Sequence, residues 1–337
     1  MKMLEDNHIE YQFIYTSQHK ETIDQIRELF NIKEPDLILF NKDEAKTVLK
    51  FLGWMGRMSL YLFTPKKVFS KKGIVLAHGD TATALWSAIC GRLAGCKVGH
   101  IESGLRSFNI FQPFPEELIR LITFRFSDIY FCPNEWALNN LRKYKGKKVN
   151  TKGNTLIDSV KLALKTPTGF VKPDEKYVVV SIHRYENIYS NKLEKIIIPY
   201  ILEVSKIFKV LFVLHPSTRE VIEKNQNIKN LLKNPSIELK PRYDYFDFVK
   251  LLEGSEFVIT DGGSNQEELS YLGKPTILMR SATERVEGLE KNIVVSGYEQ
   301  KTLNDFIKNY KTYTFAIVEL KNSPSEIILK YLNSINF

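Results

Sequence analysis

Short apolar runs rich in Val, Ile, Phe and Tyr alternate along this chain with segments of helical periodicity. Such apolar runs are typical of strands buried on both faces of a parallel sheet. Strands are predicted at residues 11–15, 36–40, 74–77, 97–101, 129–132, 147–151, 177–182, 210–214, 257–260 and 275–279. Helices are predicted at residues 20–30, 44–62, 82–94, 154–164, 192–208, 219–232, 246–252, 265–271 and 325–332.

This alternation predicts an α/β protein whose parallel sheets are covered by helices on both faces. With 337 residues the chain is too long for one ordinary core, so two domains are expected. Residues 165–176, KTPTGFVKPDEK, lack periodicity and contain two prolines and a glycine, which indicates a linker. We therefore predict domains at 1–165 and 176–337 that meet across a cleft, with the last helix as a candidate for packing back on the first domain.

The composition favours a packed, basic protein. Apolar residues make up 43% of the chain, and 48 Lys and Arg against 39 Asp and Glu give a net charge of +9. Part of the excess lies in two basic runs, 66–72 and 143–152, which are solvated loops in the simplest interpretation. No nucleic-acid-binding motif accompanies them, so the charge favours a phosphate-bearing small molecule as the anionic partner.

Cysteine usage and hydropathy predict a reduced, cytoplasmic protein. Cys90, Cys96 and Cys132 lie in apolar contexts without CxxC or Cys/His spacing, so they are interpreted as core residues and no metal site is expected. The first residues show no apolar run typical of a secretion signal, and no apolar stretch approaches the roughly 18 residues of a membrane span. Neither a membrane nor a nucleic acid is expected as a partner.

The stretch from Gly99 to Arg120, GHIESGLRSFNIFQPFPEELIR, concentrates candidate chemistry. Glu102 and Arg106 follow a predicted strand. Glu116 and Glu117 stand in the first turn of a helix, near its positive end. Carboxylates that face each other across a cleft can have their pKa values pushed apart, so that one acts as acid and the other as base. A strand end and a capped helix with surface charges explain the same residues, and the sequence leaves both interpretations open.

Polar residues follow other predicted strands in the same way. Asp80 is either the cap of the next helix or a carboxylate that faces a ligand. In the second half of the chain a histidine or arginine in such a place can act on a phosphate or balance its charge, with a structural role as the alternative. The candidates there are His183, Arg184, Glu186, His215 and Arg285. Because the carboxyl ends of parallel strands share one edge of a sheet, these residues are expected along one edge in each domain.

The segment DGGSNQEELSYLG also follows a predicted strand. Gly262 and Gly263 allow close backbone approach, and the start of the next helix presents unpaired N–H groups to an anion. Ser264 adds a hydroxyl donor. Glu267 and Glu268 come about one turn later, where a carboxylate can bind the two ribose hydroxyls of a nucleotide. An ordinary strand-to-helix turn is the alternative, but the strand, the glycine pair and the acid together favour a phosphate site.

Seven segments between residues 11 and 295 carry a specific combination. They are HGDTATALWSA, GHIESGLRS, FPEELIR, GNTLIDSV, SIHRYEN, DGGSNQEELSYLGKP and TERVEG. In this order and spacing they resemble the UDP-N-acetylglucosamine 2-epimerase family. The resemblance implies a GT-B-like pair of Rossmann-like domains, with the active site in the cleft between them, and a homodimer. It also implies that the protein uses no metal and no cofactor.

The resemblance assigns roles to individual residues. The acid/base candidates of the family are the HGD aspartate, the HxE-type glutamate and the first glutamate of PEE, which correspond to Asp80, Glu102 and Glu116. The HR histidine, near the departing diphosphate, corresponds to His183, and the last QEE glutamate, on the ribose, to Glu268. The family eliminates UDP to a glycal-like intermediate and adds it back. Interconversion of UDP-GlcNAc and UDP-ManNAc for surface polysaccharide is therefore expected.

Three alternatives to this expectation stay open, and the sequence departs from the family pattern. The alternatives are a hydrolysing 2-epimerase that releases UDP and ManNAc, a GT-B glycosyltransferase, and a non-catalytic nucleotide-sugar-binding protein. The family usually opens with a strand and a GTRPE loop, whereas residues 1–4 resemble the helix after that loop. We therefore expect this sequence to lack the first strand and an arginine-bearing loop, which leaves open a start annotated too late or an altered, inactive protein.

Two further segments bear on the branch of the family. The phosphate loop reads DGGSNQEE where the family more often has DSGGIQEE, so Gly262 and Ser264 exchange residue types. Gln18 and His19 resemble the non-hydrolysing branch, in which a second UDP-GlcNAc can bind as an activator. The non-hydrolysing branch is therefore the expected one.

Overall fold

The computed structural model describes residues 1–16, 20–40, 48–69, 72–111, 114–283, 285–319 and 323–335. The chain forms two compact units, Met1–Asp158 with Leu320–Phe337, and Ser159–Glu319. The division lies inside helix α7, Leu156–Lys165, and so precedes the expected linker at 165–176. Gln18 and His19 lie outside the described residues.

The segment expected to be a free linker packs on the second unit. Lys250 Nζ donates hydrogen bonds to the carbonyl of Thr166 at 2.6 Å and to the hydroxyl of Thr168 at 2.9 Å. The ring of Phe170 packs edge-on against Tyr243, with the ring centroids 6.4 Å apart. Prolines and a glycine marked the end of regular structure correctly, but tertiary contacts of this kind leave no local signal.

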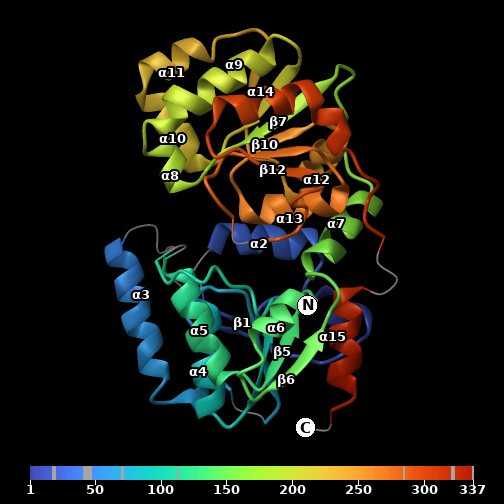
Figure 1. Cartoon of the computed structure of the whole chain (residues 1–337). Coiled ribbons are helices and arrows are strands. Elements are labelled where there is room, and N and C mark those ends of the chain that lie inside the picture. The colour runs from blue at the N-terminus through green and yellow to red at the C-terminus, as the bar shows by residue number, and fades with distance from the viewer. Residues whose placement is uncertain are drawn as a thin grey trace. The chain divides into compact units, whose positions relative to one another are not determined.

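A parallel sheet of four strands, in the order β3-β4-β5-β6, lies at the centre of the first unit (Figure 1). A separate parallel pair, β1 and β2, precedes it in sequence. The strands are β1 Ile14–Tyr15, β2 Leu37–Ile38, β3 Ile74–His78, β4 Lys97–Ile101, β5 Ile129–Cys132 and β6 Lys147–Asn150. The helices are α1 Lys2–Asp6, α2 Lys20–Leu29, α3 Val48–Tyr61, α4 Ala82–Leu93, α5 Glu116–Phe126, α6 Glu135–Asn140 and α15 Pro324–Asn333, with a 3₁₀ turn η1 at Pro65–Lys67.

Strand β5 shows why this sheet is buried on both faces. Ile129 and Phe131 point to one face and pack with Ile328 of α15. Tyr130 and Cys132 point to the other face and pack with Phe124 of α5 and with residues of α6. This alternation follows from the two-residue period of a strand, and it holds the last helix of the chain on the first unit.

The second unit is built on a six-stranded parallel sheet in the order β12-β11-β10-β7-β8-β9. Its strands are β7 Tyr177–Ser181, β8 Lys209–Val213, β9 Ile237–Lys240, β10 Val258–Thr260, β11 Thr276–Leu278 and β12 Ile293–Val295. Its helices are α8 Tyr185–Ile188, α9 Ile198–Ser205, α10 Pro216–Lys224, α11 Gln226–Leu231, α12 Tyr245–Gly254, α13 Gly263–Leu272 and α14 Gln300–Asn309. A π-helical turn, η2 Leu193–Ile197, leads into α9, and a 3₁₀ turn, η3 Tyr310–Tyr313, follows α14.

Helices cover both faces of this second sheet. One large apolar cluster joins α9, α10, α11 and α14 to one face of the strands, with Ile201, Phe212, Phe257 and Phe306 among its fully buried members. Helices α12 and α13 lie on the opposite side of the sheet in Figure 1. The predicted α/β class with parallel sheets is confirmed by both units.

Several predicted elements need correction. The strands predicted at 11–15 and 36–40 shrink to the two-residue strands β1 and β2, and the helix predicted from residue 44 is described only from 48. The helix predicted at 219–232 is two helices, because the side chain of Asn225 accepts hydrogen bonds from the N–H groups of Asn227 and Ile228 and so starts α11. The sequence reading missed β9, β12, α6, α8 and α14.

Candidate active site

Two neighbouring strand ends form the candidate site of the first unit. Strands β3 and β4 run in parallel register, with His78 opposite Ile101. Each strand is followed by a residue with a positive φ, +69° at Gly79 and +64° at Glu102. The two turns are close, because a Cβ added to Gly79 would lie 3.5 Å from a carboxylate oxygen of Glu102. A glutamate rarely adopts this backbone conformation, so tertiary structure holds Glu102 in place.

Asp80 lies at the start of α4 without capping it. The hydroxyl of Thr81 is the cap, since it accepts a hydrogen bond from the N–H of Ala84 at 3.1 Å. The carboxylate of Asp80 instead accepts a hydrogen bond from Arg120 of α5 at 2.5 Å, and its side chain is 30% exposed. The cap interpretation of Asp80 is therefore wrong, and its carboxylate stays accessible.

The two glutamates at the start of α5 have different surroundings. Glu117 is fully buried and pairs with Arg106 Nε, while the N–H of Ser107 donates to its other oxygen at 3.0 Å. Arg120 also reaches Glu117, at 3.2 Å. For Glu116, buried Oε2 has no hydrogen-bond partner among the residues that the structure describes. Glu117 thus holds the loop, whereas Glu116 takes no part in that network.

The environment of Glu117 favours its charged form. Burial would raise the pKa of Glu117, but the hydrogen bonds from Arg106 and Ser107 and the charges of Arg106 and Arg120 outweigh burial. The pKa of Glu117 is therefore held below its usual value. Arg106, a predicted substrate-binding residue, lies in this network, and its guanidinium also stacks on Phe108, 4.8 Å from the ring centroid.

His100 of β4 connects the turn at Gly79 with the turn that follows Glu102. It is 1% exposed, and its Nε2 lies 2.8 Å from the carbonyl oxygen of Gly79 while its Nδ1 lies 3.0 Å from the hydroxyl of Ser103. Burial lowers the pKa of His100 to about 4, so the ring is neutral near pH 7. The sequence reading missed this residue, although its place in a strand between two candidate turns was visible.

Asp261 organises the candidate site of the second unit. It follows β10, is fully buried, and accepts hydrogen bonds from the main-chain N–H groups of His183 and Arg184, each at 3.0 Å. The amide of Asn187 donates to the same carboxylate at 2.8 Å, and Tyr298 in turn donates to Asn187 at 2.7 Å. The sequence reading passed over Asp261, even though it stands directly before the glycine pair.

Two histidines lie beside the glycine pair. The rings of His183 and His215 are 5.4 Å apart, and a Cβ added to Gly262 would lie 3.0 Å from Cε1 of His183. Burial and the charges of His183 and Arg242 lower the pKa of His215 below its usual value. Helix α13 begins at Gly263 with no side-chain cap. Its first N–H groups thus face the position where the sequence predicts a phosphate.

The two acids of α13, Glu267 and Glu268, have different surroundings, as the two acids of α5 do. Glu267 pairs with Arg285 and accepts a hydrogen bond from Tyr271 at 2.8 Å. Glu268 is buried, and burial raises its pKa to about 7, with a hydrogen bond from Tyr245 opposing the rise. Arg285, predicted for phosphate, is therefore paired with Glu267 in this structure, and the assignment of Glu268 to a ribose stays a prediction.

Comparison with known proteins identifies the family. The family model for UDP-N-acetylglucosamine 2-epimerase matches residues 1–322. A UDP-N-acetylglucosamine 2-epimerase of Methanococcus maripaludis is 32% identical over 323 residues, which cover 89% of this chain and 84% of that protein. This chain belongs to the UDP-N-acetylglucosamine 2-epimerase family.

Solved structures agree with this assignment. The crystal structure of UDP-GlcNAc 2-epimerase from Neisseria meningitidis, bound to UDP-GlcNAc, matches with a TM-score of 0.82 and 27% identity, over 98% of this chain and 94% of that chain. The Methanocaldococcus jannaschii enzyme in complex with UDP-GlcNAc and UDP matches with a TM-score of 0.80 and 27% identity, over 98% and 93%. The expected pair of Rossmann-like, GT-B-like domains is thereby confirmed for this 2-epimerase family member.

Within this 2-epimerase, each unit brings part of the predicted site together. The first unit gathers Asp80, Glu102 and Arg106 around α5. The second unit gathers its histidines and the glycine loop around Asp261. Ser264 lies exposed in the first turn of α13, and Glu186 lies exposed on α8, with an oxygen 3.9 Å from Arg184. The assignment of these residues to substrate stays a prediction.

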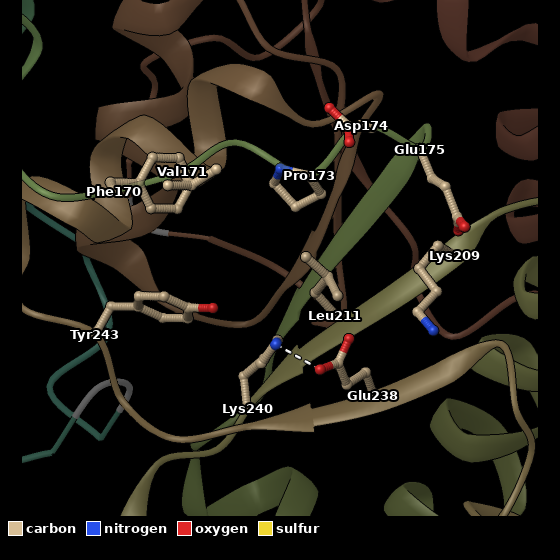
Figure 2. Close-up of a pocket in the computed structure, with 10 residues that line it drawn as sticks. All are labelled: Phe170, Val171, Pro173, Asp174, Glu175, Lys209, Leu211, Glu238, Lys240 and Tyr243. Atoms are coloured by element: carbon tan, nitrogen blue, oxygen red, sulfur yellow. Dashed lines mark hydrogen bonds and ion pairs between the residues drawn. The ribbon is translucent and has the colours of Figure 1, made fainter.

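A separate pocket lies on the second unit. Figure 2 shows this cavity of about 380 Å³ between residues 170–175 and strands β8 and β9. The rings of Phe170 and Tyr243 border one end, and Lys240 on its floor pairs with Glu238 at 2.5 Å. None of the predicted site residues lines it. The lining carries charges of both signs, so it does not indicate one class of ligand.

Two searches of the described residues bear on cofactors and membranes. No group of three His, Cys, Asp or Glu side chains in these ranges is arranged to hold a metal ion. Among the same residues no helix combines the length and apolar character that crossing a membrane needs.

Proposed function

We propose that this chain interconverts UDP-GlcNAc and UDP-ManNAc by eliminating UDP and adding it back. One observation carries the proposal: the motifs shared with the 2-epimerase family coincide with strand-end turns that are held by buried networks in each unit. Relatives of known structure bind UDP-GlcNAc, which supports the choice of substrate.

The proposed chemistry changes the configuration at carbon 2 of the sugar. The carbon 2 proton is not acidic, because no carbonyl group is adjacent to that carbon. A base removes this proton while the bond between carbon 1 and the diphosphate oxygen breaks, and UDP leaves with the electron pair. A double bond then joins carbons 1 and 2. The proton returns on the opposite face of carbon 2 as the diphosphate oxygen adds again to carbon 1.

The second unit would hold UDP through both half-reactions. His183, Arg184 and the N-terminus of α13 offer donors and positive charge to the diphosphate, which gains negative charge as it leaves. Gly262 allows the backbone to come close to this group. Glu268 would bind the ribose hydroxyls. These donors are pre-organised by Asp261, so little rearrangement is needed when charge develops.

The first unit would supply the acids and bases. Asp80, Glu102 and Glu116 are the candidates, because each carboxylate stands at a strand end or helix start and none is fully buried. A positioned carboxylate can remove the carbon 2 proton, and a second on the other face can return it. Placement of the sugar between these acids, in a cleft, is part of the proposal.

The wider setting is also proposed. A cytoplasmic homodimer that provides activated ManNAc for surface polysaccharide fits membership of the 2-epimerase family. The non-hydrolysing branch is proposed because Gln18 and His19 resemble that branch in sequence. Release of UDP and free ManNAc would indicate the hydrolysing branch.

Proton exchange at carbon 2 tests the proposal. UDP-GlcNAc is incubated with the protein in deuterium oxide and followed by proton NMR. We expect UDP-ManNAc to form with deuterium at carbon 2 and without net release of UDP. Asp80→Asn should slow exchange at least 100-fold, whereas Glu326→Gln, an exposed carboxylate of the same unit, should not change it. Absence of exchange in the wild-type protein would refute the proposal, and UDP release that requires an acceptor sugar would indicate a glycosyltransferase.

A further inference from the structure

We propose that Glu117 and Arg120 are positioning residues that fix the carboxylate of Asp80 for its role at carbon 2. The inference rests on the proposed function, because it assumes that Asp80 serves as an acid or base there. It concerns residues of α5 that lie outside the set predicted from the sequence to act on the substrate.

The guanidinium of Arg120 bridges Glu117 and Asp80. Nη1 of Arg120 donates to Oε2 of Glu117 at 3.2 Å, and Nη2 donates to Oδ2 of Asp80 at 2.5 Å. The two nitrogens belong to one rigid plane, so the place of one acceptor determines the place of the other. A lysine has a single nitrogen and cannot transmit this relation. Asp80 is thereby oriented by Arg120 of α5, which lies 40 residues later in the chain.

Glu117 is itself held in place by neighbouring donors. Arg106 Nε and the N–H of Ser107 bind its carboxylate from the loop after β4, and no part of the side chain is exposed. This loop follows the turn that carries Glu102. One network of ion pairs therefore connects the β3–α4 turn, the β4–α5 loop and the first turns of α5. A change at Glu117 would reach Asp80 through Arg120.

The exposure of Arg120 indicates a positioning role and not direct contact with substrate. Arg120 has a side chain that is 6% exposed, so little of it is open to a sugar. Asp80 is 30% exposed and engages Arg120 through Oδ2. Arg120 is buried and contacts the fully buried Glu117 on one side and the more exposed Asp80 on the other. This placement suits a residue that supports Asp80.

The test uses Arg120→Lys, Arg120→Ala and Glu117→Gln in the full chain. Arg125→Lys, an exposed position on the same helix, is the matched control. We expect Arg120→Lys to lower kcat for deuterium exchange about 100-fold, the cost of misplacing a reacting group by about 1 Å. KM should change less than threefold, and UDP affinity by calorimetry should equal that of the control. Millimolar guanidine should restore at least a tenth of the lost rate to Arg120→Ala.

The outcomes separate this inference from the proposed function. If wild-type protein shows no exchange, both proposals fail. If wild-type protein turns over and Arg120→Lys keeps its kcat, the positioning role alone is overturned. A rise in KM with unchanged kcat would also overturn it, because that pattern indicates uniform substrate binding. Should Arg120→Ala not fold, the charge-retaining Arg120→Lys carries the same test through the kcat and KM comparison.

Discussion

Replacement of Asp261 by asparagine is the most direct test of how the second unit holds its site. The carboxylate is fully buried and accepts hydrogen bonds from the N–H groups of His183 and Arg184 and from the amide of Asn187. Asp261→Asn keeps the shape of the side chain, removes its charge and turns one oxygen into a donor. With the amide nitrogen at the Oδ1 position, this donor faces the N–H of His183, which keeps only its longer 3.2 Å hydrogen bond to the other oxygen.

The expected cost follows from these contacts. A hydrogen bond to a charged acceptor contributes about 1.5–3 kcal/mol, and a neutral one about 1 kcal/mol. Three hydrogen bonds to a charged acceptor become bonds to a neutral one, and the new amide donor faces the N–H of His183, which together cost about 3–4 kcal/mol. For a domain of roughly 160 residues each kcal/mol corresponds to about 2–4 °C, so the melting temperature of this unit should fall by roughly 6–16 °C.

Thermal melting and UDP titration measure both parts of the effect. Asp305→Asn, an exposed carboxylate on α14, is the matched control and should stay within about 0.5 kcal/mol of wild type. At a temperature where both variants are folded, Asp261→Asn should bind UDP at least tenfold more weakly, because the His183–Arg184 turn loses its anchor. A variant that melts within 2 °C of wild type and binds UDP equally well would refute this account of Asp261.

Three further predictions concern one residue each. Burial lowers the pKa of His100 to about 4, against about 6.5 when unfolded, so the unfolded state binds more protons between these values. The free energy of unfolding should therefore fall by about 3 kcal/mol as pH drops from 6.5 to 4, and urea titrations should show a smaller fall for His100→Asn. The pKa of Glu268 is raised to about 7, so its contribution is present below about pH 4.5 and lost as pH rises through 7. Glu268→Gln should melt above wild type at pH 8 and close to it at pH 4.5, while binding UDP more weakly. Gly262→Ala places a Cβ 3.0 Å from His183, so calorimetry should show UDP affinity reduced about 3–10-fold, with Gly169→Ala, where nothing lies within 4 Å, as the unaffected control.

Position directly after a strand explains which site residues could be predicted from the sequence. Asp80, Glu102 and Gly262 were selected because each follows an apolar run, and each stands directly after a strand or one residue beyond it. Hydrophobic periodicity and the geometry of parallel sheets determine such positions locally. The missed strand β9 alternates two apolar residues with Glu238 and Lys240, and β12 is apolar but only three residues long, so neither gives an extended apolar run.

Partnerships between distant residues could not be predicted in the same way. Glu116 and Glu117 are adjacent and chemically identical, yet only Glu117 meets two arginines. The pairing of Asp80 with Arg120 spans 40 residues, and that of Asp261 with His183 spans 78. Which acid is buried in an ion network depends on the packing of α5 against α4 and of β10 against β7, and no local pattern contains that information.

In each unit a buried carboxylate fixes the turn that carries candidate site residues. A ligand-binding turn needs its main-chain N–H groups and side chains fixed before a ligand arrives, although a loop by itself has few contacts to fix it. In the first unit Glu117 binds the N–H of Ser107 and two arginines, and in the second Asp261 binds two successive N–H groups beside His183. Each carboxylate is fully buried and surrounded by donors, so its charge is compensated inside the protein and is not available to a substrate. The acids near the candidate site therefore fall into two classes by burial. Glu117 and Asp261 hold the turns, and the more exposed Asp80, Glu102 and Glu116 are the residues that we propose for proton transfer.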